Sequence, residues 1–299
     1  MTLRRTLLIT PATDEELVRK GRATDADALF LDLEDGVPSE QKTHARNAVT
    51  SVLESDSEDG KAITVRINGV ETPWWYEDLI DVVSASAGAI DSLIVPKVST
   101  PKQLHAVDLL LTQVEGNAGL SVGAIGIIAQ LETVAAVNNA IAIARSTDRL
   151  SALLFGPGDY SASLGVKKNE ARASEGPRWE YARSRIVNAA KEVQIQAVDG
   201  LYPETEDVEG FRASCQHARG LGFDGKTVVH PKQIRIANDV FTPSRQEITR
   251  AKEIYDAYEA SGGKHETVKV DGRIIDKETF EMSKEVIEKA TAAGKIDGV

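Results

Sequence analysis

The stretch that decides the fold is ALFLDLEDGVPSE, residues 28–40, where a short apolar run passes directly into acidic residues. The residues from Ala28 to Leu33 are apolar apart from Asp32, and Glu34 and Asp35 follow at once. An apolar run of this length is typical of a buried strand, whereas adjacent acids are typical of a loop. The junction raises the question of why carboxylates should stand where a buried strand ends.

Seven further runs have the same character, and each ends near Pro, Asp, Glu, Gly or Asn. Helix-like stretches separate them, for example residues 38–53, which begin with Pro38. Short apolar strands that alternate with helices predict parallel pairing. Eight such units favour an α/β fold of the closed (β/α)₈ TIM barrel type over an open doubly wound sheet. The expected strands start at Thr6, Ala28, Ile63, Ser92, Ile125, Ala152, Ile195 and Lys226.

The pattern changes near Thr242, which predicts a barrel domain over residues 1–242 and a C-terminal extension over 243–299. The extension reads as a helix ended by Gly262 and Gly263, a hairpin around 271–272 and a final helix. Such a segment is too short for a core of its own. We expect this helix-hairpin-helix extension to pack on the barrel and on a neighbouring subunit.

Composition excludes several classes of protein. The 299 residues carry a net charge of −11, which argues against nucleic-acid or anionic-membrane binding. No apolar run approaches the roughly 18 residues of a membrane span. The single cysteine, Cys215, excludes an internal disulfide and suits a reducing compartment. These features predict a cytoplasmic protein.

The barrel answers the opening question, because its active site forms where the carboxyl ends of the strands meet. Polar residues directly after an apolar run are then directed at a common mouth. The residues at the strand ends are Pro11, Glu34, Asp35, Arg66, Asn68, Lys97, Gln130, Glu132, Asp159, Asp199 and His230.

Two of these acids, Glu132 and Asp159, follow strands of high apolarity on expected neighbours in the barrel. Carboxylates on adjacent strand ends suit Mg²⁺, which takes oxygen ligands and needs only one or two protein carboxylates. A zinc site is not indicated, since there is one cysteine and the five histidines show no close pairing.

Lys97, at the end of the fourth strand, has two interpretations. It is either a Schiff-base nucleophile of a metal-free aldolase, which needs a lowered pKa, or an ion-pair partner of nearby acids such as Glu132. The ion pair is the more common role for such a lysine.

Several motifs in order resemble the citrate lyase β-subunit-like branch of the HpcH/HpaI aldolase superfamily, whose relatives include malyl-CoA lyases and malyl-CoA thioesterases. The resemblance runs from about Arg5 to Ala290. Two departures stand out, since relatives typically have Gly at position 12 and often Leu at position 160, where this chain has Ala12 and Tyr160. The matching stretches are DADALFLDLEDGV, KTHAR, TVRING, LIVPKV, AQLET, ALLFGPGDYSASLG, VDGLYP, LGFDGKTVVHPKQI and DGRIID.

The resemblance implies a Mg²⁺-dependent (β/α)₈ barrel that is commonly a homotrimer. It implies that Glu132 and Asp159 are metal ligands and that Arg66 faces substrate oxygens. Glu34 and Asp35 would line the same mouth, where they would hydrogen-bond metal-bound water or orient cations. Asp276 would be a catalytic acid carried over the active site of a neighbouring subunit. The expected substrate-binding residues are Arg66, Lys97, Pro157 and Gly158.

The resemblance further implies a carbon–carbon lyase that cleaves or forms a β-hydroxyacyl-CoA of the malyl-CoA or citryl-CoA type through an enolate. Its small-molecule partners would be a 2-oxo acid and an acyl-CoA. Three alternatives stay open: a malyl-CoA-type thioesterase, a metal-dependent pyruvate aldolase without CoA, and a citrate lyase β-subunit that acts on acyl groups of an acyl carrier protein. The residues themselves do not define the acyl group.

Overall fold

The computed structural model describes residues 2–54, 61–166, 179–261, 267–270 and 272–297. The chain divides into two compact units, Arg4–Asn238 on the one hand and Met1–Leu3 with Asp239–Val299 on the other. The domain boundary expected at residue 242 stays a prediction.

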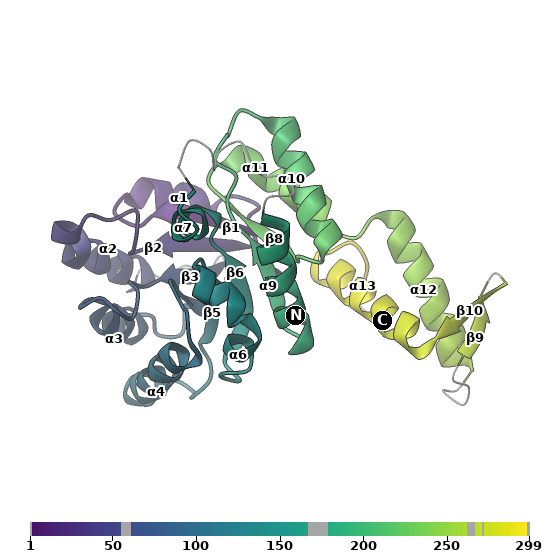
Figure 1. The fold of residues 1–299 in the computed structure, drawn as a ribbon, viewed down its shortest axis with the longest axis horizontal. Helices are drawn as coiled ribbons and strands as arrows, with labels where there is room; N and C mark the ends of the chain where they lie inside the picture. The colour runs from purple at the N-terminus through teal and green to yellow at the C-terminus, as the bar shows by residue number, and fades with distance from the viewer. Residues whose placement is uncertain (1, 55–60, 167–178, 262–266, 271, 298–299) are drawn as a thin grey trace. The chain divides into compact units, whose positions relative to one another are not determined.

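Eight parallel strands of the first unit close into a barrel in chain order, with β8 pairing with β1 (Figure 1). The predicted (β/α)₈ barrel is confirmed, and each of the eight predicted runs supplies one strand. The strands are β1 (Thr6–Pro11), β2 (Ala28–Asp32), β3 (Ala62–Arg66), β4 (Ser92–Val95), β5 (Gly126–Leu131), β6 (Leu150–Phe155), β7 (Gln196–Asp199) and β8 (Gly225–Val228).

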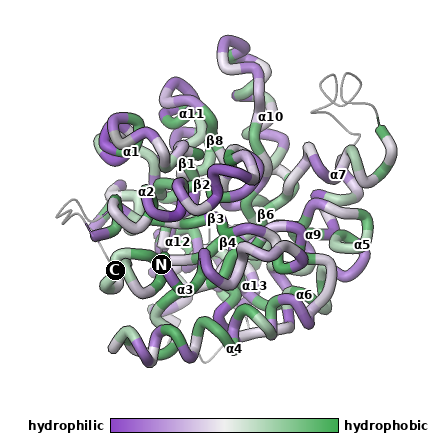
Figure 2. Tube along the Cα trace, turned by 90° about the vertical axis from the view of Figure 1, so that its left-hand side faces the viewer, coloured by the Kyte–Doolittle hydropathy of each residue, from purple (hydrophilic) through white to green (hydrophobic). Residues whose placement is uncertain are grey.

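Helices connect successive strands and cover the outside of the barrel (Figure 1). Hydrophobic and hydrophilic residues alternate along them, as α4 shows in Figure 2, so that one face of each helix can pack on the strands. These elements are α1 (Glu15–Arg22), the 3₁₀ turn η1 (Ser39–Gln41), α2 (Lys42–Glu54), α3 (Trp75–Ala85), α4 (Pro101–Asn117), α5 (Val134–Asn138), α6 (Ala140–Ala144), α7 (Pro157–Ser163), α9 (Glu180–Glu192), α10 (Val208–Leu221) and α11 (Pro231–Phe241).

The interior of the barrel is filled by apolar side chains from most of its strands. Phe30 of β2 and Leu154 of β6 belong to one buried cluster, and Ile9 of β1 packs against it. A barrel interior of this kind is a packed core and not a pore. The cluster therefore gives the residues above it a rigid floor.

The register of the strands determines which strand ends become neighbours. Asp32, the last residue of β2, pairs with Arg66, the last residue of β3. Leu131 of β5 pairs in the same way with Phe155 of β6. The residues that follow these two, Glu132 and Gly156, therefore leave the barrel side by side. The carboxyl end of β2, within residues 28–40, and the two predicted metal ligands, Glu132 and Asp159, therefore lie at the same rim of the barrel.

The prediction that Asp199, at the end of β7, faces the mouth of the barrel is wrong. Its side chain is fully buried, and it pairs with Lys226 of β8 at 2.6 Å and Arg183 of α9 at 3.1 Å. Burial would raise the pKa of Asp199, but the charges of Lys226 and Arg183 lower it overall. An acid at a strand end can thus tie a helix to the barrel instead of serving the active site.

The second unit contains the predicted helix, hairpin and helix, which confirms the C-terminal extension. They are α12 (Arg245–Ala260), β9 (Thr267–Val270), β10 (Arg273–Asp276) and α13 (Lys277–Ala292). Gly262 and Gly263, predicted to end the first helix, lie outside the described residues, as does Asp271 of the hairpin turn. Stacking of Phe280 on Tyr258, with ring centroids 4.2 Å apart, joins α13 to α12. Among the helices of the described residues, none is long and apolar enough to cross a membrane.

Asp199→Asn should destabilise the barrel by roughly 3–5 kcal/mol at neutral pH, because it removes the buried carboxylate with which Arg183 and Lys226 pair. Since the native pKa of Asp199 is depressed, its stabilising contribution is present above the unfolded pKa of about 3.9 and is lost as pH falls below it. Urea unfolding between pH 3 and 8 measures both effects. Glu206→Gln, which removes an exposed ion pair with Lys232, is the control and should leave stability unchanged. Equal stability of Asp199→Asn and wild type at pH 7 would contradict the assignment.

Candidate active site

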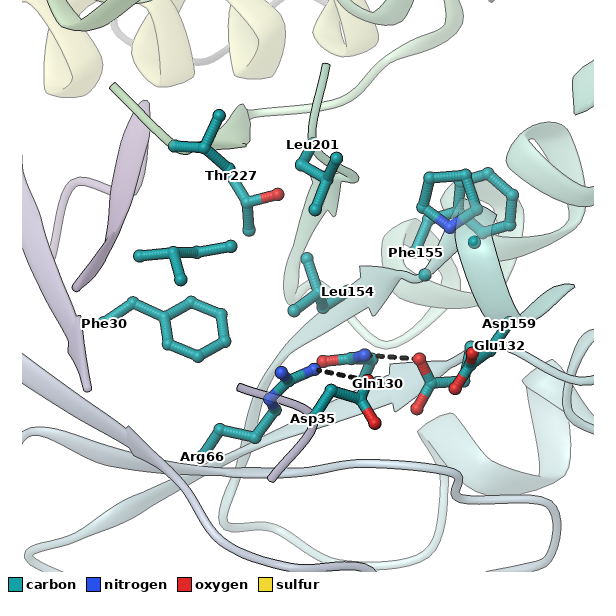
Figure 3. Close-up of a pocket in the computed structure, with 15 residues that line it drawn as sticks. Phe30, Asp35, Arg66, Gln130, Glu132, Leu154, Phe155, Asp159, Leu201 and Thr227 are labelled. Atoms are coloured by element: carbon teal, nitrogen blue, oxygen red, sulfur yellow. Dashed lines mark hydrogen bonds and ion pairs between the residues drawn. The ribbon is translucent and has the colours of Figure 1, made fainter. Parts of the chain in front are cut away.

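A cavity of about 270 Å³ opens at the carboxyl ends of the barrel strands (Figure 3). It lies on the floor that the buried cluster forms, since Phe30 and Leu154 belong to both. Ile9, which also lines the cavity, packs against the cluster. This is the end of a (β/α)₈ barrel at which active sites form. The residues that line it are Ile9, Phe30, Asp35, Arg66, Gln130, Glu132, Leu154, Phe155, Gly156, Pro157, Gly158, Asp159, Leu201, Thr227 and Val229.

Arg66 is held in place by Asp32, its register partner on β2. The Nε and Nη2 groups of Arg66 each donate a hydrogen bond of 2.7 Å to one oxygen of Asp32. The guanidinium also lies over the ring of Phe30, 5.5 Å from its centroid. Burial alone would lower the pKa of Arg66, but the hydrogen bonds and charge of Asp32 raise it. The cation is therefore permanent and rigidly oriented.

The same carboxylate shapes the loop after β2. Asp32 accepts hydrogen bonds from the backbone N–H groups of Glu34 at 2.9 Å and Gly36 at 3.1 Å. The buried ammonium of Lys42 donates to the carbonyl oxygens of Leu33 and Glu34 at 2.8 and 2.7 Å. The acids at the carboxyl end of β2 thus have two roles: Asp32 fixes the turn after the strand, and that turn holds Glu34 and Asp35 at the mouth of the barrel.

Lys97 connects the loops after β2, β4 and β6. Its ammonium lies 2.7 Å from Glu34, 3.2 Å from Asp35 and 3.4 Å from Asp159. Burial would lower the pKa of Lys97, but the hydrogen bond with Glu34 and the charges of Glu34 and Asp35 raise it. A Schiff-base lysine needs the opposite shift. The structure supports the ion-pair interpretation of this residue.

Glu132 and Asp159 lie side by side at the edge of the cavity (Figure 3). Glu132 accepts a 2.7 Å hydrogen bond from the backbone N–H of Lys97 and another from the amide of Gln130. Gly156 is the neighbour that makes room for Glu132, since a Cβ there would lie 2.5 Å from the Oε2 atom of Glu132. Only glycine allows this close approach of strand end and carboxylate.

The electrostatics of this pair are unusual. Burial, followed by the charge of Glu34, raises the pKa of Glu132 to about 8, and the charge of Asp159 adds to the effect. Burial also raises the pKa of Glu34, although Arg66 and Lys97 oppose the shift. A carboxyl group with a strongly raised pKa in a cavity is a mark of a functional site.

The donor set of the mouth fits a hard divalent cation. Asp159 has a buried oxygen, Oδ2, that accepts no hydrogen bond. Its negative charge disfavours ionisation of Glu132 and so raises the pKa of Glu132. Among the described residues no group of three or more His, Cys, Asp or Glu is placed to hold a metal ion. A pair of carboxylates suits Mg²⁺, which takes oxygen ligands and keeps several waters, better than zinc, which prefers Cys and His.

The structure brings nearly all of the predicted site residues together. Contacts connect Glu34, Asp35, Arg66, Lys97, Glu132 and Asp159, while Pro157 and Gly158 line the cavity.

Asp276 belongs to the other compact unit, where it is the N-cap of α13. Its Oδ1 accepts hydrogen bonds from the N–H and hydroxyl groups of Thr279 at 2.8 and 2.7 Å. These two hydrogen bonds lower the pKa of Asp276, and the residue is exposed.

Sequence reasoning missed some contributors and misplaced others. The clamp that Asp32 places on Arg66 was missed, although an acid within an apolar strand was its visible signal. Asn68 does not line the cavity, because its backbone and side-chain nitrogens donate to Asp78 at 2.9 and 2.6 Å. Tyr160 is buried between Phe155 and Trp179, with ring centroids 5.6 and 5.5 Å away. The unusual tyrosine thus fills the core beside the site and is not a cavity residue.

Comparisons with known proteins agree with this geometry. The model of the family described as HpcH/HpaI aldolase/citrate lyase matches residues 5–231. The L-malyl-CoA/beta-methylmalyl-CoA lyase of Cereibacter sphaeroides is 32% identical, over 95% of this chain and 93% of its own length. The citrate lyase subunit beta of Leuconostoc mesenteroides subsp. cremoris is 31% identical, over 99% of this chain and 96% of its own length.

Solved structures show the same relationship. Protein CitE from Mycobacterium tuberculosis, in complex with magnesium, acetoacetate and coenzyme A, is 26% identical with a TM-score of 0.71, over 96% of this chain and 98% of its own. A charged cavity at the carboxyl ends of a (β/α)₈ barrel is typical of an enzyme active site. The chain belongs to the HpcH/HpaI aldolase/citrate lyase family, which confirms the resemblance seen in the sequence. It is a carbon–carbon lyase.

Proposed function

We propose that the protein catalyses the Mg²⁺-dependent, reversible cleavage of a β-hydroxyacyl-CoA into a 2-oxo acid and an acyl-CoA. The observation that carries this proposal is the pairing of Glu132 and Asp159 beside a fixed Arg66 at the mouth of the barrel. The relatives named malyl-CoA lyase and the CitE structure with magnesium and coenzyme A support it.

Glu132 and Asp159 would hold the metal ion. Bound there, Mg²⁺ would supply Lewis-acid polarisation and orientation of the oxygens of the 2-oxo acid part. The protein's own contribution is to keep both carboxylates in place: Lys97 and Gln130 hydrogen-bond Glu132, and Gly156 leaves it room. A divalent ion would also stabilise the ionised form of Glu132, since burial and the charges of Glu34 and Asp159 raise its pKa to about 8.

In the cleavage direction, the bond between the hydroxyl-bearing carbon and the α-carbon of the thioester breaks. Its electron pair moves to the α-carbon as an enolate, and the hydroxyl group loses its proton and becomes the carbonyl of the 2-oxo acid. We assign the acceptance of the hydroxyl proton to Asp35, the half-exposed carboxylate of the cavity lining. Arg66 would offset the negative charge on oxygen as it develops, a contribution of roughly 3–4 kcal/mol.

The enolate must take up a proton at its α-carbon, and we assign this step to Asp276. General acid–base catalysis of this kind contributes roughly 10²–10⁴-fold. The family resemblance supports a homotrimer in which the C-terminal extension of one subunit brings Asp276 to the mouth of the next. Glu34 and Lys97 would act as positioning residues that keep Asp35 and Asp159 oriented.

A second candidate is a citrate lyase β-subunit that acts on acyl groups carried by an acyl carrier protein. The 31% identity to such a subunit favours it. It shares the metal and the bond cleavage with the first candidate but differs in the carrier of the acyl group. Cleavage of free CoA thioesters without any partner protein would exclude this second candidate. If the products of that cleavage include a 2-oxo acid instead of a free hydroxy acid, the thioesterase is excluded as well. The buried thiol of Cys215 is compatible with work in the cytoplasm.

Glu132→Gln and Asp159→Asn should each lower the affinity for Mg²⁺ by at least about tenfold, because each removes one of two charged ligands. Isothermal titration calorimetry with MgCl₂ measures this directly, and release of 2-oxo acid from malyl-CoA with and without EDTA measures the effect on turnover. Asp148→Asn, at an exposed position after α6, is the matched control. Wild-type Mg²⁺ affinity in both site variants would rule out the metal assignment.

Asp276→Asn should reduce kcat by roughly 10²–10⁴-fold and leave Mg²⁺ affinity unchanged. Asparagine caps a helix about as well as aspartate does, so this variant removes the acid without removing the cap of α13. Thermal unfolding should therefore match that of the wild type. Glu278→Gln, in the same helical turn, should keep full turnover. Undiminished kcat in Asp276→Asn would show that this carboxylate does not transfer the proton.

A further inference from the structure

Gln233 lies outside the cavity but holds two of the loops that form its wall. It is the third residue of α11 and is 2% exposed. Its Oε1 atom accepts a hydrogen bond of 2.9 Å from the backbone N–H of Val229, in the loop after β8. Its Nε2 atom donates one of 2.9 Å to the carbonyl oxygen of Tyr202, in the loop after β7. One buried amide group therefore joins the two loops.

The two loops lie beyond the hydrogen bonding of their own strands. The pairing of β7 with β8 ends at Asp199 and Lys226. The residues of these segments that line the cavity include Leu201 and Val229, which follow further along the chain (Figure 3). The position of this part of the wall is therefore not determined by the strand pairing alone.

The connection needs a side chain that donates and accepts a hydrogen bond at once. An amide has both groups, whereas an apolar side chain of the same length would leave the loops without these two bonds. An ion pair of 2.8 Å between Lys232 and Glu206 also connects α11 to the loop after β7, but both side chains are exposed. Solvent screens such a pair, so it contributes little. Gln233 is therefore the stronger of these two connections.

The loop after β7 in turn supports the proposed metal ligand Asp159. Gly200 packs so closely on Pro157 that a Cβ at Gly200 would lie 2.2 Å from the Cδ atom of Pro157. Pro157 is the first residue of α7, and Asp159 lies in the first turn of that helix. Closely packed groups transmit a displacement to their neighbours. A shift of the loop after β7 should therefore move Pro157 and Asp159 with it.

We propose that Gln233 is a positioning residue of the active site. Its amide holds the loops after β7 and β8 together as one wall, and the loop after β7 keeps Asp159 in place for the metal ion through Gly200 and Pro157. Gln233 does not line the cavity, so it acts only through these loops. The inference rests on the proposed function, which assigns Asp159 to the metal site.

Gln233→Met tests the inference, because methionine has nearly the same length but no donor and only a weak acceptor. We expect the affinity for Mg²⁺ to fall about threefold or more, as for the loss of other groups that orient metal ligands. We expect kcat for the release of 2-oxo acid from malyl-CoA to fall by roughly tenfold or more, since a displacement of about 1 Å can cost 10²-fold. Isothermal titration calorimetry with MgCl₂ and steady-state kinetics measure the two effects, both well below the unfolding temperature of the variant.

Asn238→Leu is the matched control, because Asn238 makes the same kind of double contact from the same helix. Its Oδ1 atom accepts from the hydroxyl of Thr6 at 2.9 Å, and its Nδ2 atom donates to the carbonyl oxygen of Asp25 at 2.7 Å. Both partners lie at the amino ends of strands, since Thr6 begins β1 and Asp25 precedes β2. This variant should lose stability but keep wild-type Mg²⁺ affinity and kcat.

Gln233→Asn carries the test if the methionine variant does not fold. Its amide is one methylene shorter and cannot span both loops, so Mg²⁺ affinity and kcat should fall in the same direction. Wild-type Mg²⁺ affinity and kcat in the Gln233 variants, or equal losses in Asn238→Leu, would overturn the inference and leave the lyase assignment intact. A wild-type enzyme that does not cleave malyl-CoA with Mg²⁺ would instead count against the proposed function, while the Mg²⁺ titrations would still decide whether Gln233 positions Asp159.

Discussion

The mouth of the barrel concentrates more negative charge than its own cations neutralise, and this excess is the constraint on which the site depends. Five carboxylates face three cations, those of Arg66, Lys97 and the buried Lys42. The carboxylates are those of Asp32, Glu34, Asp35, Glu132 and Asp159. Unpaired buried charge is costly, and proteins respond by pairing the group, protonating it or binding a metal ion. In this chain the cost falls mainly on Glu132, which is 2% exposed and has a pKa of about 8. A divalent cation between Glu132 and Asp159 is the response that fits both the charge and the oxygen donors.

Lys97 offsets part of that excess negative charge. Its backbone N–H donates to Glu132, while its ammonium reaches Glu34, Asp35 and Asp159. The residue adopts a φ of +53°, a left-handed conformation that costs energy for a side chain other than glycine. Strained backbone of this kind persists where the surroundings impose it, and here it allows one residue to contact both proposed metal ligands.

The fold could be predicted from the sequence because it depends on local patterns. Eight apolar runs with helices between them predict a parallel barrel, and the active site of such a barrel forms at the carboxyl ends of its strands. Whether a side chain at a strand end faces the mouth could not be predicted. Successive side chains of a strand point to opposite faces of the sheet, and the direction also depends on partners far away in the sequence. Asp199 and Asp32 illustrate this, since one pairs with a helix outside the mouth and the other clamps Arg66. The resemblance, and not the pattern, pointed to Asp276.

The most direct test of the central claim is the anomalous difference density of crystals grown with Mn²⁺ as a substitute for Mg²⁺. The account predicts one strong peak at the barrel mouth, bonded to one oxygen of Glu132 and one of Asp159, at distances near the roughly 2.0–2.1 Å typical of Mg²⁺. A mouth without a peak, with the two carboxylates turned away from each other, would contradict it.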